Sequence, residues 1–316
     1  MRVALLFIDG VGVGARDAAV NPLARLDLLL SQFEDGTGAT LPYGGRRLDL
    51  DTTFGVEGRP QSATNQTAIF TGRPAPKLLG KHVLGFPTAP LRALIAEASI
   101  IRQLADAGRT ATFANAYPAA WLDVLGVPRR ASSTPDLHVP ERYRKKGKAS
   151  ASTLAMAAGK VELRTFDDAR RGQGLTHDID GTLARARGLD VPTRTPREAA
   201  EIFWGLARDF TLFEHYLADE AGHEQDFPRA LRALETFDAF AREVIAARPA
   251  DAQVLIVSDH GNVEDLSTRS HTRNPVALLS FGPAQVEAHT VADVGRLILE
   301  LSGRDQGSPA PVSHRL

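Results

Sequence analysis

Apolar runs that end in an aspartate most constrain how this chain can fold. The runs and the acids that follow them are residues 3–8 with Asp9, 210–218 with Asp219, and 253–258 with Asp259. Continuous apolar runs of this length are typical of strands buried on both faces, as in parallel sheets. Helical patterns separate the runs, and this alternation predicts an α/β fold whose mostly parallel sheet is sandwiched by helices.

Other segments extend this alternation. We expect helices over 91–107, 197–208, 227–247 and 291–301, and strands over 110–114 and 275–281. Residues 60–72 are predicted to be a loop that enters a helix, with Ser62 or Thr64 near the helix start.

The chain divides into three parts by composition. We predict a discontinuous α/β core of residues 1–117 and 191–302, a small inserted cap of residues 118–190, and a loose tail of residues 303–316. The cap contains several Pro and Ser residues, and the alternative is a long irregular loop.

Composition limits the class of protein. The 316 residues are 43% hydrophobic and 24% charged, as in soluble globular proteins. The charges nearly cancel, with a net charge of −1, so no basic excess favours nucleic acid as a partner. The N-terminal apolar run is too short for a signal peptide, and no stretch approaches the ~20 apolar residues of a membrane span. We therefore expect a cytoplasmic protein with neither a nucleic-acid nor a membrane partner, and the sequence leaves the oligomeric state open.

The acids are expected to converge, because ligands bind outside the carboxyl ends of strands in open α/β sheets. Each acid alone could be a turn residue. Histidines accompany the second and third acids: they are His223, His260 and His271. Three carboxylates and three imidazoles suffice for two divalent cations, and this donor set suits zinc or manganese, with magnesium as the alternative. Cysteine is absent, which excludes thiolate ligands.

A hydroxyl nucleophile would complete such a site. Ser62 is the candidate and Thr64 the alternative. Metal coordination lowers the pKa of a serine hydroxyl, and two cations can clamp the attacking and phosphoryl oxygens during displacement. A helix start at Ser62 would also turn free backbone N–H groups toward a phosphate.

Four segments carry a family resemblance: DGVG at 9–12, DEAGH at 219–223, SDHGN at 258–262 and SHTRNPVAL at 270–278. They resemble the alkaline phosphatase superfamily, and most of all its branch of cofactor-independent phosphoglycerate mutases and phosphopentomutases. The resemblance covers about residues 1–75 and 195–300.

The resemblance implies roles for individual residues. One metal would be held by Asp219, His223 and His271. The other would be held by Asp9, Asp259, His260 and the oxygen of Ser62, which would also be the catalytic nucleophile. Asn65 falls where phosphodiesterase relatives place an asparagine that contacts the substrate phosphate.

The chain also departs from the mutase pattern. Asn65 and Gln66 stand where the mutases have a Gly-His pair, and the cap is too small to be their second domain. We therefore expect hydrolysis of a small phosphorylated substrate through a phosphoserine. A phosphosugar or phosphoglycerate mutase is the alternative, and a catalytically silent metal-binding homologue is a third hypothesis.

Three further features have two interpretations each. His177 could act as an acid–base group or lie in a surface loop, and His215 is expected to pack in the core. The basic run of residues 142–146 could attract an anionic substrate or be a solvated face. The glycines of residues 10–14 lack the G-x-G-x-x-G spacing, which excludes a dinucleotide loop.

Overall fold

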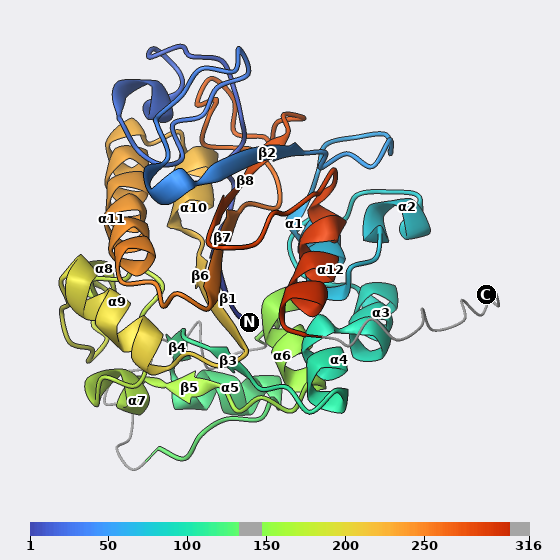
Figure 1. The fold of residues 1–316 in the computed structure, drawn as a ribbon, viewed down its shortest axis with the longest axis vertical. Helices are drawn as coiled ribbons and strands as arrows, with labels where there is room; N and C mark the ends of the chain where they lie inside the picture. Colours follow the sequence, from blue (N-terminus) through green and yellow to red (C-terminus); the bar gives the residue numbers. More distant parts are fainter. Residues whose placement is uncertain (133–146, 304–316) are drawn as a thin grey trace.

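A six-stranded sheet with the order β2-β8-β7-β1-β6-β3 forms the centre of the protein (Figure 1). The computed structural model describes residues 1–132 and 147–303. The strands are β1 (Arg2–Ile8), β2 (Arg46–Leu50), β3 (Ala111–Phe113), β6 (Phe210–His215), β7 (Ala252–Val257) and β8 (Val276–Phe281). Strands β7, β1, β6 and β3 run parallel, which confirms the predicted mostly parallel sheet.

Helices cover both faces of this sheet (Figure 1). On one face lie α9 (Pro196–Gly205), α10 (Leu217–Glu224) and α11 (Phe227–Ala246). On the other lie α1 (Ser62–Thr71), α3 (Ala89–Ala98), α4 (Ile100–Asp106), α6 (Ala151–Ala158) and α12 (Val291–Leu301). The shorter helices are η1 (Pro22–Arg25), η2 (Pro42–Gly44), α2 (Ala75–Leu79), α5 (Ala119–Leu125), α7 (Phe166–Arg170) and α8 (Thr182–Ala186).

Strand β1 shows why the predicted runs are continuously apolar. Its alternate residues Val3, Leu5 and Phe7 join the core beneath α1 and α12. Ala4, Leu6 and Ile8 join the core beneath α9 and α11. Because both faces of the strand are buried, neither set can be polar.

Capping residues fix where several helices begin. Thr195 and Glu198 form a capping box at α9, and Thr290 and Asp293 form another at α12. The side chain of Asp226 caps α11. Each box satisfies N–H groups that the first turn of a helix leaves unpaired.

Two expectations about local structure were wrong. The single helix predicted over 91–107 is broken at Ser99, whose buried hydroxyl caps α4 and donates to the carbonyl oxygen of Ala155. Strand β6 ends at His215, so Asp219 lies in the first turn of α10 instead of following the strand. The apolar residues Leu217 and Ala218 are buried by the helix, and this burial made them resemble a strand.

Strand β8 is antiparallel to β7, unlike its neighbours in the core of the sheet. Residues 258–275 contain no helix, and a parallel connection usually requires a helical crossover. The reversal matters for the site. It brings the segment before β8, including His271, to the edge where β1 and β7 end.

The segment predicted as a cap contains β5 (Arg164–Thr165), which pairs in parallel with β4 (Ala116–Tyr117), the two residues directly before the segment. Helix α6 of this segment packs against α1, α3 and α4. The boundaries of the cap stay a prediction, and the predicted tail lies beyond the described residues from 304 onward. No helix within 1–132 or 147–303 has the length and apolar character to cross a bilayer.

Ser99 offers a test of the break between α3 and α4. Replacing it (Ser99→Ala) removes a cap and one of the two hydrogen bonds that the carbonyl of Ala155 accepts, the other coming from the N–H of Gly159, so we expect a loss of about 1–2 kcal/mol in the free energy of unfolding. Urea denaturation measures this loss. Thr88→Ala is the matched control, because Thr88 begins α3 without a side-chain cap bond, and it should cost less than about 0.5 kcal/mol. Equal effects of the two changes would contradict this account of the break.

Candidate metal centre and catalytic serine

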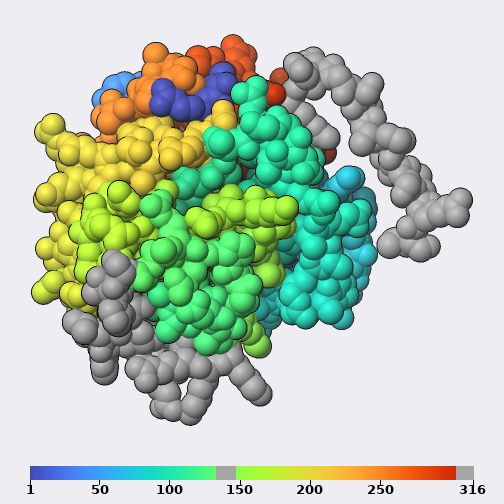
Figure 2. All heavy atoms as spheres, turned by 90° about the horizontal axis from the view of Figure 1, so that it is seen from below, coloured from blue at the N-terminus to red at the C-terminus, as the bar shows by residue number. Residues whose placement is uncertain are grey.

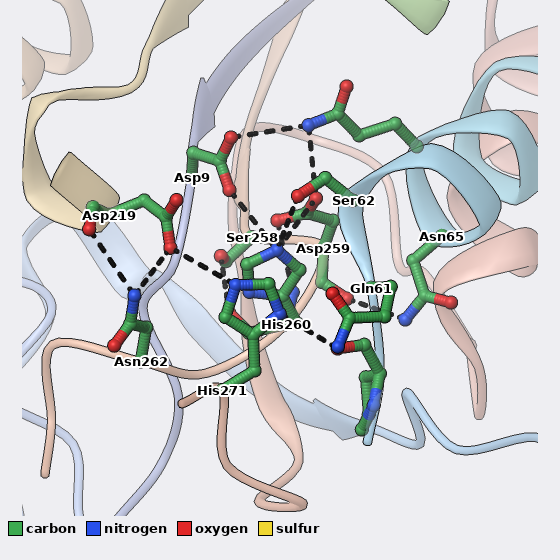
Figure 3. Close-up of polar contacts among 12 residues, drawn as sticks. Asp9, Gln61, Ser62, Asn65, Asp219, Ser258, Asp259, His260, Asn262 and His271 are labelled. Carbon is green, nitrogen blue, oxygen red and sulfur yellow. Dashed lines mark hydrogen bonds and ion pairs between the residues drawn. The ribbon is translucent and has the colours of Figure 1, made fainter. Parts of the chain in front are cut away.

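Asp9, Asp259 and His260 form one group of side chains at the carboxyl edge of the sheet (Figure 3). Nε2 of His260 lies 3.4 Å from Oδ1 of Asp9 and 3.4 Å from Oδ2 of Asp259. The hydroxyl oxygen of Ser62 lies 2.9 Å from the same nitrogen. Ser62 is the first residue of α1, and its helix starts without a side-chain cap.

Asp219, His223 and His271 form a second group. Asp219 and His223 are four residues apart on α10, so they lie on the same face of the helix. Their Oδ2 and Nε2 atoms are 3.3 Å apart, and Nε2 of His271 lies 3.7 Å from Oδ1 of Asp219. The rings of His271 and His260 stack at 3.7 Å, which places the two groups side by side.

The imidazoles of the second group are arranged as metal ligands. Nδ1 of His223 donates to the carbonyl oxygen of Arg269, and Nδ1 of His271 donates to that of Pro60. A neutral ring that donates through Nδ1 presents a lone pair at Nε2. The two Nε2 atoms are 3.2 Å apart, so a shared proton or a metal cation beside both would relieve the repulsion of two facing lone pairs.

The charged groups of the site also favour cation binding. Burial and the charge of Asp259 raise the pKa of Asp9 well above its usual range. The hydrogen bond with Asp219 raises the pKa of His223 to about 9. Oδ1 of Asp9 is buried without a hydrogen-bond partner. Three acids thus meet at one edge, and an oxygen of one of them is left without a hydrogen-bond donor, so this set of carboxylates and imidazoles fits divalent cations.

Residues 64–66, which follow the serine, have separate structural contacts. The Thr64 hydroxyl donates to the carbonyl oxygen of Gln61, and the residue is buried. Nδ2 of Asn65 donates to the carbonyl oxygens of Thr52 and Asp259 at 2.9 and 2.8 Å. Asn65 thus braces the loop of Asp259, and its contact with a substrate phosphate stays a prediction.

Gln66 links the carboxylates of the first group. Its Nε2 donates to Oδ2 of Asp9 at 3.2 Å and to Oδ2 of Asp259 at 3.1 Å. A single amide group thereby bridges two buried acids from different strands. The departure from the mutase pattern at this position consequently lies inside the site.

Close backbone approaches bring α10 against the loop after β1. Gly10 has a φ of +74°, and a Cβ there would meet Oδ1 of Asp219 at 2.6 Å. A Cβ on Gly222 would meet the Asn262 side chain at 2.7 Å. Nδ2 of Asn262 in turn donates to Oδ1 of Asp219 at 2.7 Å. Glycine at these positions lets the helix, the loop and the amide meet around one carboxylate.

Glu264 joins the two loops that carry the first group. Its Oε2 accepts from the backbone N–H of Gly12 at 2.9 Å and from that of Asn262 at 2.7 Å. Its Oε1 accepts from the hydroxyl of Thr272. Because this carboxylate is buried and fully used, it orients the ligands without being one of them.

A cavity of about 510 Å³ opens from Ser62. At the serine end it is lined by Asp9, Gln66 and Glu214. The remaining walls come largely from the cap segment, whose green and yellow-green atoms cover much of the face shown in Figure 2. Glu214 accepts from the Ser152 hydroxyl at 2.9 Å, and burial raises its pKa to about 7.

The histidines near this cavity differ in position. His177 lines the cavity, and burial lowers its pKa to about 3. His215 is fully buried beside Phe237, as expected of a core residue. The basic run of residues 142–146 lies outside the described residues, whereas the neighbouring Lys148 lines the cavity.

Comparison with known sequences supports the motif assignment. The family model described as "Metalloenzyme superfamily" matches residues 200–303. This match confirms the family resemblance that the motifs indicated. This Metalloenzyme segment contains Asp219, His223, Asp259, His260 and His271, whereas Asp9 and Ser62 lie outside it and join the site through the fold.

Two curated relatives cover part of the chain. A 2,3-bisphosphoglycerate-independent phosphoglycerate mutase of Halobacterium salinarum is 36% identical over 95 residues, which is 28% of this chain and 19% of the relative. A phosphopentomutase of Methylobacterium sp. (strain 4-46) is 46% identical over 67 residues, which is 21% of this chain and 16% of the relative. The match thus spans less than a fifth of either relative.

Solved structures share the fold over nearly the whole chain. Alkaline phosphatase from the Antarctic bacterium TAB5 has a TM-score of 0.55 at 14% identity and covers 95% of this chain and 98% of its own. Thermus thermophilus alkaline phosphatase has a TM-score of 0.52 at 13% identity and covers 95% of this chain and 91% of its own. These similarities confirm the alkaline phosphatase-like fold.

The structure brings together all seven residues predicted to hold metals. It adds residues that sequence analysis missed, namely Gln66, Glu214, Asn262 and Glu264. One signal was present for Glu214, because a charged residue inside an otherwise apolar strand requires a partner or a function. For Gln66 the replaced Gly-His pair marked the position but did not indicate its contacts.

Gln66 provides a test of how the first group is held. In Gln66→Leu the carboxylates of Asp9 and Asp259 lose their shared donor, so metal-free protein should lose about 1–3 kcal/mol in its free energy of unfolding. Urea denaturation in the presence of a chelator measures the loss. The exposed glutamine in Gln285→Leu is the control, with an expected effect below about 0.5 kcal/mol. An unchanged midpoint for Gln66→Leu would show that the bridge contributes nothing.

Proposed function

We propose that this protein hydrolyses a phosphate ester through a phosphoserine at Ser62 and depends on two divalent metal ions. One observation carries the proposal. The Ser62 hydroxyl lies at the start of α1, beside the group of Asp9, Asp259 and His260, and Ser62 lines a cavity. A nucleophile, a cation-binding edge and space for a substrate therefore meet at one point.

The metal ligands follow from the two groups of side chains. Asp219, His223 and His271 would hold one ion, and Asp9, Asp259, His260 and the Ser62 oxygen would hold the other. Imidazole and carboxylate donors favour zinc or manganese, with magnesium as an alternative. When bound, the ions lower the pKa of the serine hydroxyl and neutralise phosphoryl charge.

The chain's own groups account for the chemical steps. Ser62 Oγ attacks phosphorus, a bond from Oγ to phosphorus forms, and the bond from phosphorus to the ester oxygen breaks as the alcohol leaves with a proton. Free N–H groups in the first turn of α1 orient the phosphoryl oxygens. Water then cleaves the phosphoserine, which releases inorganic phosphate and restores the hydroxyl.

Hydrolysis is favoured over the mutase reaction, in which the phosphoryl group would be transferred back to another hydroxyl of the same molecule. Two proteins that share the fold over nearly the whole chain are named alkaline phosphatases, and this similarity supports the hydrolytic interpretation. The mutase alternative is favoured by the names of the relatives that match a quarter of the chain. Gln66 stands where the mutases have the histidine of their Gly-His pair, and its amide contacts Asp9 and Asp259. The first group therefore departs from the mutase pattern.

Metal content tests the ligand assignment. We expect about two equivalents of zinc or manganese per chain after stripping with a chelator and reloading, measured by elemental analysis of the desalted protein. His223→Ala and Asp259→Ala should each retain about one, because each removes a ligand of a different ion. His289→Ala removes an exposed histidine outside both groups and should retain two. A wild-type protein that binds no metal under these conditions would refute the assignment.

Activity tests the nucleophile. The reloaded protein should release phosphate from p-nitrophenyl phosphate, and Ser62→Ala should lower kcat by about a thousandfold or more and abolish a phosphoserine trapped by acid quenching. Thr64→Ala is the control for the neighbouring hydroxyl and should retain most activity.

The same assay separates the alternatives. The other substrates are ribose 1-phosphate and 3-phosphoglycerate. An isomerised product without free phosphate would show that the protein is a mutase and would refute the proposed hydrolysis. Bound metal with neither turnover nor phosphoserine would identify a silent homologue.

A further inference from the structure

The cavity that begins at Ser62 has an aromatic wall. Four rings from separate parts of the chain form it: Tyr117, Trp121, His177 and Tyr216. Tyr117 and Trp121 stack with centroids 5.0 Å apart and an interplanar angle of 21°. The His177 ring lies 5.1 Å from Tyr117 at an interplanar angle of 69° and 4.5 Å from Tyr216 at 55°, so each ring contacts the next along the cavity.

This wall is built by local sequence and by packing. Tyr117 ends β4 and Trp121 lies in the first turn of α5, so the turn between them sets their rings against each other. His177 is held from behind, because its Nδ1 lies 3.2 Å from the carbonyl oxygen of Glu214 and 3.1 Å from Nδ2 of Asn115. The rings are therefore fixed in place before any ligand arrives.

The charges along the cavity limit what its substrate can carry. Among the described lining residues the cations are Lys148 and Arg187. Arg187 is paired with Glu220 at 3.3 Å, and Lys148 lies over the Phe86 ring at 6.0 Å. The walls also carry the acids Asp178 and Glu214. Among these described residues, a carboxylate on the substrate's organic group would meet more negative than positive charge.

We infer that the organic group of the substrate is uncharged and carries a flat aromatic ring, which stacks on the wall of Tyr117, Trp121, His177 and Tyr216. The inference rests on the proposed function, which places the phosphoryl group at Ser62. A cavity of about 510 Å³ has room for a phosphoryl group and an arylalkyl or nucleoside-sized group. Stacking on apolar ring faces stabilises a bound aromatic group, whereas a small, hydroxylated group makes no such contact.

Matched esters test this substrate class on the metal-loaded protein. Benzyl phosphate and ethyl phosphate have alkoxide leaving groups of similar basicity, so their ratio of kcat/KM reports the wall and not the chemistry. We expect benzyl phosphate to be favoured about 10- to 100-fold. A ratio within twofold, or a preference for 3-phosphoglycerate or ribose 5-phosphate, would overturn the inference and leave the proposed hydrolysis intact.

Trp121 gives the matched variants. Trp121→Ala should raise the KM for benzyl phosphate about tenfold while ethyl phosphate changes less than twofold, and Trp121→Phe should restore most of the preference. Val124→Ala, an exposed position on the same helix, should leave the ratio unchanged. An unchanged ratio in Trp121→Ala would remove this residue from the wall and contradict the inference.

A binding measurement distinguishes the two proposals. The chain has two tryptophans, so Trp204→Phe leaves Trp121 as the single fluorescent reporter. Benzylphosphonate, which cannot be hydrolysed, should quench it with a Kd about tenfold or more below that of methylphosphonate. Such binding without turnover of any ester would support the aromatic site and refute the proposed hydrolysis. Equal binding of the two phosphonates would refute the aromatic site.

Discussion

Repulsion between buried carboxylates at the carboxyl edge of the sheet is the constraint on which the rest of the site depends. Asp9 and Asp259 follow the ends of the adjacent strands β1 and β7, and burial strengthens the interaction of their charges. The amide of Gln66 donates hydrogen bonds to both carboxylates, and the imidazole of His260 lies beside them. These two groups do not neutralise both acids. Divalent cations are the groups that balance such a cluster, and Ser62 is placed where their effect on a hydroxyl would be greatest.

This arrangement requires loops that hold their positions. Glu264 ties the loop after β1 to the loop after β7 through backbone N–H groups. Gly10 lets α10 come so close that Asp219 reaches the same edge, although it belongs to a helix. The positions of the candidate ligands therefore depend on the buried contacts that hold their loops and helix in place.

Most of the candidate metal ligands and most of the aromatic wall lie in different parts of the chain. The Metalloenzyme segment of residues 200–303 carries most of the ligand motifs. Tyr117, Trp121 and His177, which form most of the aromatic wall, lie outside it. A shared ligand set can therefore accompany different organic groups, and the names of partial relatives indicate the chemistry of the edge better than the substrate.

The layered fold and the candidate ligands could be predicted from the sequence alone, because buried strands require continuous apolar runs and metal binding requires particular donor types at fixed spacing. The sequence could not place the break at Ser99 or the helix around Asp219, where burial made helical residues resemble a strand. Only the tertiary structure decided that β8 runs antiparallel, that Gln66 bridges two acids and that four rings line one cavity. These features depend on contacts between residues far apart in the chain, and no local pattern encodes which distant side chains meet.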